Sequence, residues 1–552
     1  MSTKTRLRPG PSLLLSVRAA FCLTLPLVAG VIIGQRRDST LFALGALWAV
    51  SQDGLDSWHV RSHRLLSVVV GSGLGFALGV IFVSLTSVSV LLLLLYAGVA
   101  LAAGLLEASG LPAGGMYVLL GAIVGGGLRL GGSGWLACVL VSAGALWVWF
   151  VAAATDHRSR RERERICVAE GLEDLAACLR AVGGSDFASA RREATRLLDT
   201  AQDVVGTRPP RPDDPEEVAM FQCLTAALRC GEIVSFLAGT GAEIPQQLCT
   251  ALDRSASELR QGSADRAVVV LEGPDVVGPT TEARVGSVIR QALHEPEPVL
   301  TEARVYPSTR FSLLLSERFR FGVVLAASIA LAAVVARVLR GLHSFWLPLA
   351  VAFIARPDLG PLIPRAMERT VGTLTGVGIA AAVSITGNSL LLLIVLSCLM
   401  AAAVPWASRR SHALTVIAFT PIVFVFLSVL GPDQYLFVPR IVDTALGAAI
   451  VLFMDVAFWS TAPSFRPSAQ VERSRRAVSS YEACDQRTDV NEHHLRRRRA
   501  FRAITDARAS VVRALSEPLA WRRPDPGLLQ QLDRLSVAID AHTVAMLTEE
   551  AK

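Results

Sequence analysis

The stretch LHSFWLPLAVAFIARPDLGPLIPRAMERTVGTLTG, residues 342–376, decides the fold class of this chain. An apolar segment of only 14 residues, 342–355, ends at a charged, proline-containing turn, and a second apolar segment starts near residue 370. A helix of that length is about 21 Å long and cannot cross a hydrocarbon core of roughly 30 Å unaided. The short segment is either a broken helix beside a transport site or a tilted span in a thinned bilayer, and the sequence leaves both readings open.

The composition places this stretch in an integral membrane protein. Of the 552 residues, 52% are hydrophobic and only 18% are charged, which is too apolar for a soluble chain of several domains. Twelve apolar segments, most of them close to the roughly 20 residues that span a bilayer, fall into two groups of six. They are residues 19–34, 39–52, 65–84, 88–106, 114–128 and 134–154, then 321–339, 342–355, 370–386, 389–404, 413–430 and 441–460. Two polar blocks follow the two groups.

The chain contains an internal repeat. Shifting the sequence by 305 positions aligns the two apolar groups with little or no gap. The aligned identities include Ser39 with Ser344, Asp53 with Asp358, Arg64 with Arg369, Gly71 with Gly376, and Gly73 with Gly378. Even numbers of spans make the two repeats parallel. We therefore expect an all-α, polytopic membrane protein with two repeats of about six transmembrane helices, at 1–154 and 316–462, each followed by a cytoplasmic helical domain, at 155–315 and 463–552.

Both polar blocks carry the spacing of amphipathic helices. Apolar residues recur every three or four positions, as expected for one buried helix face. These stripes are Leu172, Leu175, Leu179 and Val182 in the first block, and Leu529, Leu532, Leu535 and Ile539 in the second.

The basic charge points to a membrane rather than to nucleic acid. The net charge is +7, but only Lys4 and Lys552 among the 54 basic residues are lysines, and many arginines flank apolar segments. Arginines after the even-numbered segments place those loops, both termini and the central block in the cytoplasm, although Arg36 and Arg37 fall on the other side. We expect the lipid bilayer of the cell inner (plasma) membrane as a partner, no nucleic acid, and leave a homo-oligomer open.

The sequence gives no sign of a metal, a cofactor or an enzyme. The nine cysteines form no CxxC pair and have no histidine at ligand spacing. The segment GGSGW, residues 131–135, lacks the end of a nucleotide-binding P-loop, which argues against ATP as the driving force.

Candidate site residues follow the short segment of the second repeat. Arg369 lies near the start of a helix, where the helix dipole disfavours a cation. A partner such as Asp358, or an anionic ligand, would compensate for this cost. Arg356 is the other ligand candidate, because the first repeat has no arginine at the equivalent position.

The first repeat keeps part of this pattern. Asp53 and Arg64 align with Asp358 and Arg369, whereas Ser51 and Gln52 stand in place of Arg356 and Pro357. A structural clamp between Asp53 and Arg64 is the simpler interpretation of this pair, and a binding role is the alternative.

Small residues and isolated acids mark the remaining apolar segments. Gly71, Gly75 and Gly79 are spaced by four, as are Gly372, Gly376 and Ala380, so the third helix of each repeat is expected to pack closely against the other or against a neighbour. In the last segment we expect Asp443 to pair with Arg440, and Asp455 is a candidate for a proton relay.

These residues resemble a known family. FWLPLAVAFIARPDLGPLIPRAMERTVGTLTGVGIA, residues 345–380, and RIVDTALGAAIVLF, residues 440–453, are similar to the signatures of the fusaric acid resistance, or aromatic acid exporter, family. The resemblance rests on Arg356, Pro357, Arg369, Gly372 and Thr373, and extends to the first half only through the repeat.

The resemblance implies an inner-membrane efflux transporter of small aromatic carboxylates or related weak acids, coupled to the proton gradient. Arginines would bind the carboxylate, and Trp48 and Trp346 would stack on the ring. An interfacial aromatic belt explains the tryptophans equally well. A membrane scaffold that recruits partners through its polar blocks, or a channel, remains the alternative function.

Overall fold

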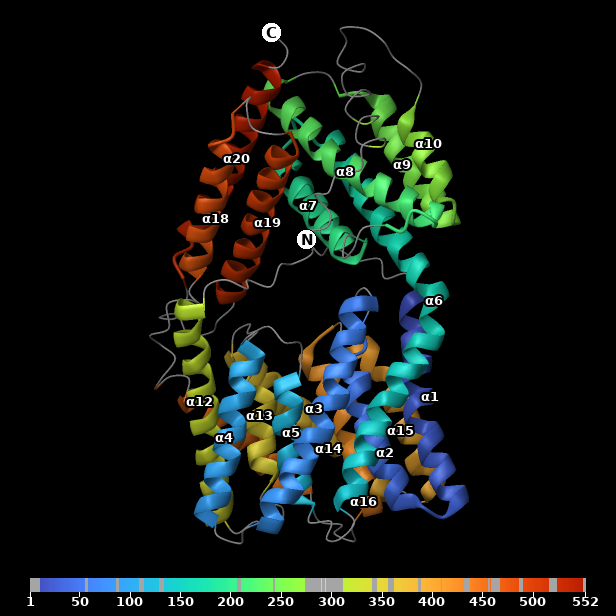
Figure 1. The fold of residues 1–552 in the computed structure, drawn as a ribbon, viewed down its shortest axis with the longest axis vertical. Helices are drawn as coiled ribbons and strands as arrows, with labels where there is room; N and C mark the ends of the chain where they lie inside the picture. The colour runs from blue at the N-terminus through green and yellow to red at the C-terminus, as the bar shows by residue number, and fades with distance from the viewer. Residues whose placement is uncertain are drawn as a thin grey trace. The chain divides into compact units, whose positions relative to one another are not determined.

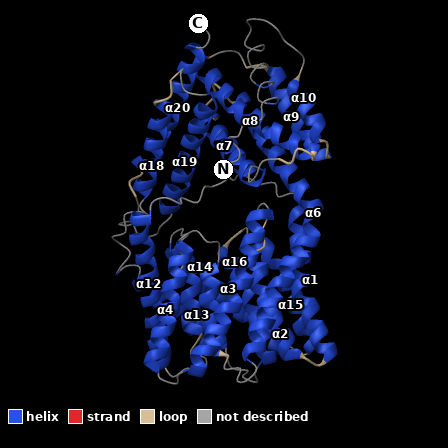
Figure 2. Ribbon diagram, viewed as in Figure 1, coloured by secondary structure: helices blue, strands red, loops and turns tan. Residues whose placement is uncertain are grey.

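The structure of the chain is a computed structural model. It describes residues 10–549 except for 55–57, 86–88, 109–113, 129–133, 206–209, 242–243, 274–288, 290–292, 294–310, 340–344, 356–361, 386–388, 409, 431–436, 455–456, 458–466, 486–489 and 516–523. Within these residues all regular secondary structure is helical (Figure 2), which confirms the predicted fold class.

The chain divides into two compact units. The membrane unit comprises residues 1–156 and 306–462, and the helical unit comprises residues 157–305 and 463–552. The two polar blocks, expected as separate domains, thus contribute to one unit. Helix α6 (Gly134–Arg180) supplies residues to both units.

The membrane unit contains a helix for each of the twelve predicted apolar segments (Figure 1). Those of the first repeat are α1 (Gly10–Ile33), α2 (Arg36–Gln52), α3 (Trp58–Leu85), α4 (Ser89–Ala108), α5 (Gly114–Gly127) and α6. Those of the second repeat are α12 (Phe311–Val338), α13 (Trp346–Ile354), α14 (Leu362–Ile385), α15 (Leu390–Ala407), α16 (His412–Leu430) and α17 (Phe437–Met454).

The helix pairings are repeated in the two halves and cross between them. The first helix of each repeat packs against the fourth helix of the other, α1 on α15 and α12 on α4 (Figure 1). The third and fifth helices pack together within each repeat, α3 on α5 and α14 on α16. Equivalent pairings in both halves are consistent with the duplication predicted from the sequence.

Six of the described helices are long and apolar enough to cross a membrane by length and composition. Five lie in the membrane unit, and four shorter apolar helices accompany them there. The sixth, α8 (Pro215–Thr240), is instead the core helix of the helical unit, because it packs against α7, α10 and α20 and is largely buried by them.

Helices α2 and α13 are the two short segments predicted from the sequence, and both lie inside the unit. Helix α13 has nine residues, and all but Phe353 are buried. Helix α2 is buried over most of the stretch from Thr40 to Val50. It begins at Arg36 rather than at residue 39, so Arg36 and Arg37 form its first turn and not a loop. The hydroxyl of Thr40 donates to the carbonyl of Arg36 at 2.7 Å and supports that turn.

The glycine-rich faces pack within each repeat. A Cβ atom at Gly71 would lie 2.7 Å from the carbonyl oxygen of Gly114 on α5. A Cβ atom at Gly376 would lie 2.7 Å from the Cβ of Thr420 on α16. The third helices therefore approach the fifth helices of their own repeats. Of the two predicted arrangements, packing against a neighbouring helix is the one observed.

The helical unit is also built from both halves. Its other helices are α7 (Phe187–Val205), α9 (Gln246–Gln261), α10 (Ala264–Glu272), α18 (Pro467–Glu482), α19 (Val490–Leu515) and α20 (Gly527–Glu549). Helix α7 packs on α19, and α8 packs on α20. The predicted stripes are largely confirmed, since Leu172, Leu175 and Leu179 are buried in one core cluster and Leu532 and Ile539 in another.

Candidate ligand-binding cavity of the membrane unit

The two short helices meet at a cavity of about 390 Å³. Residues of α2 and α5 from the first repeat, and of α13, α14, α16 and α17 from the second, line it. Cavities of roughly 300–1,000 Å³ with mostly apolar walls and a few polar groups are typical of small-molecule sites. Segments far apart in the sequence thus converge on one partly open cavity of ligand size.

Aromatic rings form much of the wall. Trp48 on α2 and Tyr117 on α5 lie with ring centroids 6.0 Å apart. Phe345 and Trp346, at the start of α13, are stacked with centroids 4.8 Å apart. All four residues line the cavity, so a planar apolar ligand would find flat surfaces from both repeats.

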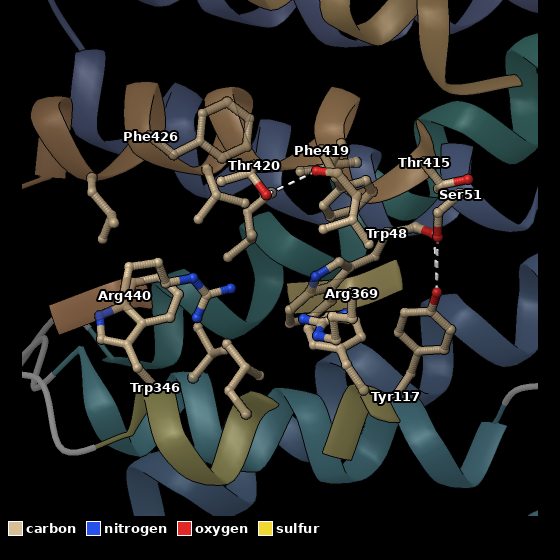
Figure 3. Close-up of a pocket in the computed structure, with 18 of the residues that line it drawn as sticks. Trp48, Ser51, Tyr117, Trp346, Arg369, Thr415, Phe419, Thr420, Phe426 and Arg440 are labelled. Atoms are coloured by element: carbon tan, nitrogen blue, oxygen red, sulfur yellow. Dashed lines mark hydrogen bonds between the residues drawn. The ribbon is translucent and has the colours of Figure 1, made fainter. Parts of the chain in front are cut away.

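Three arginines contribute positive charge. Arg365 and Arg369 are one turn apart on α14 and share a helix face, and Arg440 comes from α17. The Arg369 guanidinium lies over the ring of Phe353 at 4.6 Å, and that of Arg440 over Trp346 at 4.1 Å. Figure 3 shows the side chains of Arg369 and Arg440 entering the same space.

No aspartate or glutamate is among the described residues that line this cavity. Arg365 and Arg440 also lie in the first turns of their helices, where the positive end of the helix dipole adds to the potential. The described lining of the cavity therefore carries a net positive charge.

Arg440 is the most informative of the three arginines. Its side chain is 8% exposed, and its buried Nη1 has no hydrogen-bond partner. Asp443, predicted as its partner, lies three residues away on α17 and interacts with it electrostatically, although no salt bridge joins these two described side chains. The guanidinium is turned toward Trp346 and the cavity instead.

A group of neutral polar side chains faces the cavity from the first repeat. The amide Nε2 of Gln52 donates to the Tyr117 hydroxyl at 3.0 Å. The Ser51 and Tyr117 hydroxyls are 3.0 Å apart, and Ser51 donates to the carbonyl of Trp48 at 2.7 Å. Ser51 and Gln52 lie one turn after Trp48, so α2 presents all three on one face.

The structure brings some of the sequence-predicted site residues together and leaves others apart. Trp48, Trp346 and Arg369 line the cavity. Arg356, Asp358 and Asp455 lie outside the described residues.

Asp53 is paired differently from the prediction. Its carboxylate forms ion pairs with Arg18 of α1 and with Arg61 of α3, the latter at 3.2 Å, and not with Arg64. Arg61 and Arg64 are three residues apart on α3, and the helix turns Arg61 toward the end of α2, where Asp53 lies. Neither Asp53 nor Arg64 is among the residues that line the cavity.

Several polar lining residues were not predicted as site residues, among them Arg365, Arg440, Gln52 and Tyr117. Arg440 could have been predicted as a site residue, because a charged residue at the start of this apolar segment is unusual. It was instead predicted to pair with Asp443. The sequence repeat gave no indication that Tyr117 lines the cavity, because its contact with Gln52 depends on how α2 and α5 pack.

Comparisons with known proteins agree with this architecture. Residues 331–454 match the family described as fusaric acid resistance protein-like. The uncharacterized membrane protein YvaC of Bacillus subtilis (strain 168) is 24% identical over 485 residues, which cover 80% of this chain and 72% of that protein. No solved structure matches the chain. Residues 331–454, which include all three cavity arginines, are therefore similar to the fusaric acid resistance protein-like family, and most of the chain is similar to a membrane protein.

Proposed function

We propose that the protein is an efflux transporter of small aromatic carboxylates and related weak acids. The observation that carries this proposal is the cavity between the two short helices, which combines three arginines and several aromatic rings without a described acidic residue. A guanidinium binds a carboxylate through a planar fork, and flat rings stack on an aromatic substrate. The match to a fusaric acid resistance protein-like family supports the same substrate class.

The arginines and the tryptophans of the cavity have different proposed roles. Arg369 and Arg440 bind the carboxylate, and Trp48 and Trp346 flank the ring. Arg356 and Asp358 remain predicted contacts from the sequence, as does Asp455 for proton coupling. For Asp53 and Arg64 we propose a structural role, because neither lines the cavity.

We further propose that the protein lies in the plasma membrane with both termini and the helical unit in the cytoplasm. The arginines that follow the even-numbered apolar segments support this orientation. The resemblance to the fusaric acid resistance protein-like family supports coupling to the proton gradient, and the lack of a P-loop motif in the sequence argues against ATP as the driving force. If Asp455 carries the proton, Asp455→Asn abolishes the dependence of efflux on the pH gradient.

The test compares two arginines that both stack on tryptophan. Arg440→Ala is expected to reduce export of labelled benzoate by about tenfold to a hundredfold, the worth of a hydrogen bond to a charged group. Arg410 lies over Trp406 at 4.3 Å but is exposed and does not line the cavity, so Arg410→Ala should leave export unchanged. Accumulation is measured in cells that lack the protein and in cells complemented with each variant at equal expression.

Two outcomes would refute the transporter proposal. Equal accumulation in deletion and complemented cells across a broad panel of aromatic acids would favour the scaffold alternative. If Arg440→Ala and Arg410→Ala reduced export equally, transport would not depend on the cavity.

A further inference from the structure

The cavity differs chemically from one end to the other. In Figure 3 Arg440 and Trp346 lie on one side of the space, and Ser51 and Tyr117 lie on the opposite side. The first group carries a buried cation, whereas the second consists of hydroxyls together with the Gln52 carboxamide. A ligand held by its acidic group at Arg440 would therefore present its other end to neutral polar groups.

The two repeats differ in sequence at the neutral end of the cavity. Ser51 and Gln52 of the first repeat stand where the second repeat has Arg356 and Pro357. The duplicated segments have thus diverged at these positions, and the first repeat supplies hydrogen-bonding groups without charge.

Counting hydrogen bonds identifies the group that is available to a ligand. The Gln52 carboxamide can make two donor and two acceptor interactions, and one N–H is used on the Tyr117 hydroxyl at 3.0 Å. The structure shows no other partner for this amide among the described residues. The Ser51 hydroxyl proton is directed to the carbonyl of Trp48. Tyr117 therefore orients the amide and leaves its carbonyl and second N–H for the cavity.

We infer that the Gln52 carboxamide, positioned by Tyr117, selects substrates that carry a neutral hydrogen-bonding group at the end opposite the acidic group. This inference rests on the proposed transport function and adds its specificity. A site that hydrogen-bonds a substrate group discriminates against an analogue without that group, because the half-buried amide then lacks that partner inside the occupied cavity.

The test uses two probes of nearly equal shape. 4-Carbamoylbenzoate can donate to and accept from an amide, whereas 4-isopropylbenzoate can do neither. Uptake into inside-out membrane vesicles that contain the full-length protein is measured by mass spectrometry. The wild-type protein should transport the carbamoyl probe at least about tenfold more efficiently, as judged by kcat/KM.

Three variants test which residues cause the preference for the carbamoyl probe. Gln52→Leu should bring the ratio of the two probes close to one, because the amide that distinguishes them is gone. Tyr117→Phe should lower the ratio by about threefold to tenfold, the worth of one hydrogen bond, because the amide loses the partner that orients it. Tyr96→Phe is the matched control, since Tyr96 lies on α4 and does not line the cavity, and its ratio should equal that of the wild type.

The outcomes separate the two proposals. If neither probe enters faster than into vesicles without the protein, the transport function itself is refuted. If both probes are transported equally well by the wild type, or if Gln52→Leu keeps the wild-type ratio, only the specificity inference is overturned. Should Gln52→Leu not accumulate, an unchanged ratio in Tyr117→Phe overturns the inference.

Discussion

Asp53 shows how one buried carboxylate fixes several helices of the membrane unit. It follows α2 directly and pairs with Arg18 of α1 and Arg61 of α3. Arg18 also donates to the Thr155 hydroxyl of α6 at 3.3 Å. The Asp53 side chain is 6% exposed, and those of both arginines are buried more deeply. The two ion pairs and this hydrogen bond together join four helices around the end of α2, which carries Ser51 and Gln52.

Asp53→Asn is therefore expected to destabilise the protein strongly. The substitution removes the negative charge that two buried guanidinium groups share, and breaking a buried ion pair typically costs about 3–5 kcal/mol. Asp38→Asn is the control, because Asp38 lies in the first turn of α2 and contributes about 1 kcal/mol or less through the helix dipole. Thermal unfolding of the purified proteins in detergent measures both effects, and equal melting temperatures would contradict the structural role of Asp53.

Individual site residues could be predicted only where the sequence marked them locally. Trp48 and Trp346 lie on the two short segments, and Arg369 lies close behind one of them, so short length and an unusual charge identified all three. The partner of Asp53 could not be derived in the same way. Arg18 reaches it through the packing of α1, and the rotation of α3 selects Arg61 over Arg64.

At the scale of the helix, the glycine positions set how closely two helices can approach. Gly376 and Gly378 are two residues apart on α14, but their surroundings differ. A Cβ atom at Gly376 would meet the Thr420 Cβ at 2.7 Å, whereas at Gly378 it would meet nothing within 4 Å. In lipid, where packing drives helix association, such a difference decides which positions tolerate a side chain.

Alanine at these two positions should act in opposite directions. Gly376→Ala forces α14 away from α16 and should lower the free energy of unfolding by about 1–3 kcal/mol. Gly378→Ala should be neutral or stabilise the protein by up to about 1 kcal/mol, because alanine favours the helix without a clash. The melting temperatures in detergent distinguish the two variants. Destabilisation of the same size in both would show that helix packing is not the cause.

The elements themselves were largely predictable, since hydropathy alone located the twelve helices of the membrane unit. Helix ends were less certain, as the earlier start of α2 at Arg36 shows. Helix α8 is apolar enough to cross a membrane, and its composition did not indicate that it forms the core of the helical unit. Burial by α7, α10 and α20 is a property of the assembled helices that no window of sequence contains.

At the scale of the whole molecule, buried charge in the helical unit holds the two polar blocks together. The Glu232 carboxylate of α8 contacts the His494 ring of α19 at 2.5 Å, and Arg497 donates to the Gly231 carbonyl at 3.0 Å. Burial raises the pKa of Glu232, but the charge of His494, its hydrogen bond and two nearby arginines outweigh burial and lower that pKa to about 2. The carboxylate thus stays ionised across the physiological range.

The neighbouring His493 makes the stability of the helical unit depend on pH. Burial lowers the pKa of His493 from 6.5 to about 4. Between these values the unfolded chain binds a proton that the folded chain does not, so the free energy of unfolding falls as the pH drops from about 6.5 to about 4. His493→Asn should flatten the dependence of the melting temperature on pH in this window. If the melting temperatures of the variant and the wild type changed with pH in parallel, His493 would not be the cause of the pH dependence.

The crossed packing of α1 on α15 and of α4 on α12 bears on how the chain is assembled. During synthesis α1 enters the bilayer long before α15 exists, so the face that α15 will cover stays in contact with lipid until most of the protein has been made. Neither repeat can complete its own packing alone. Separately expressed halves should therefore be degraded when made singly and persist only when they are produced together.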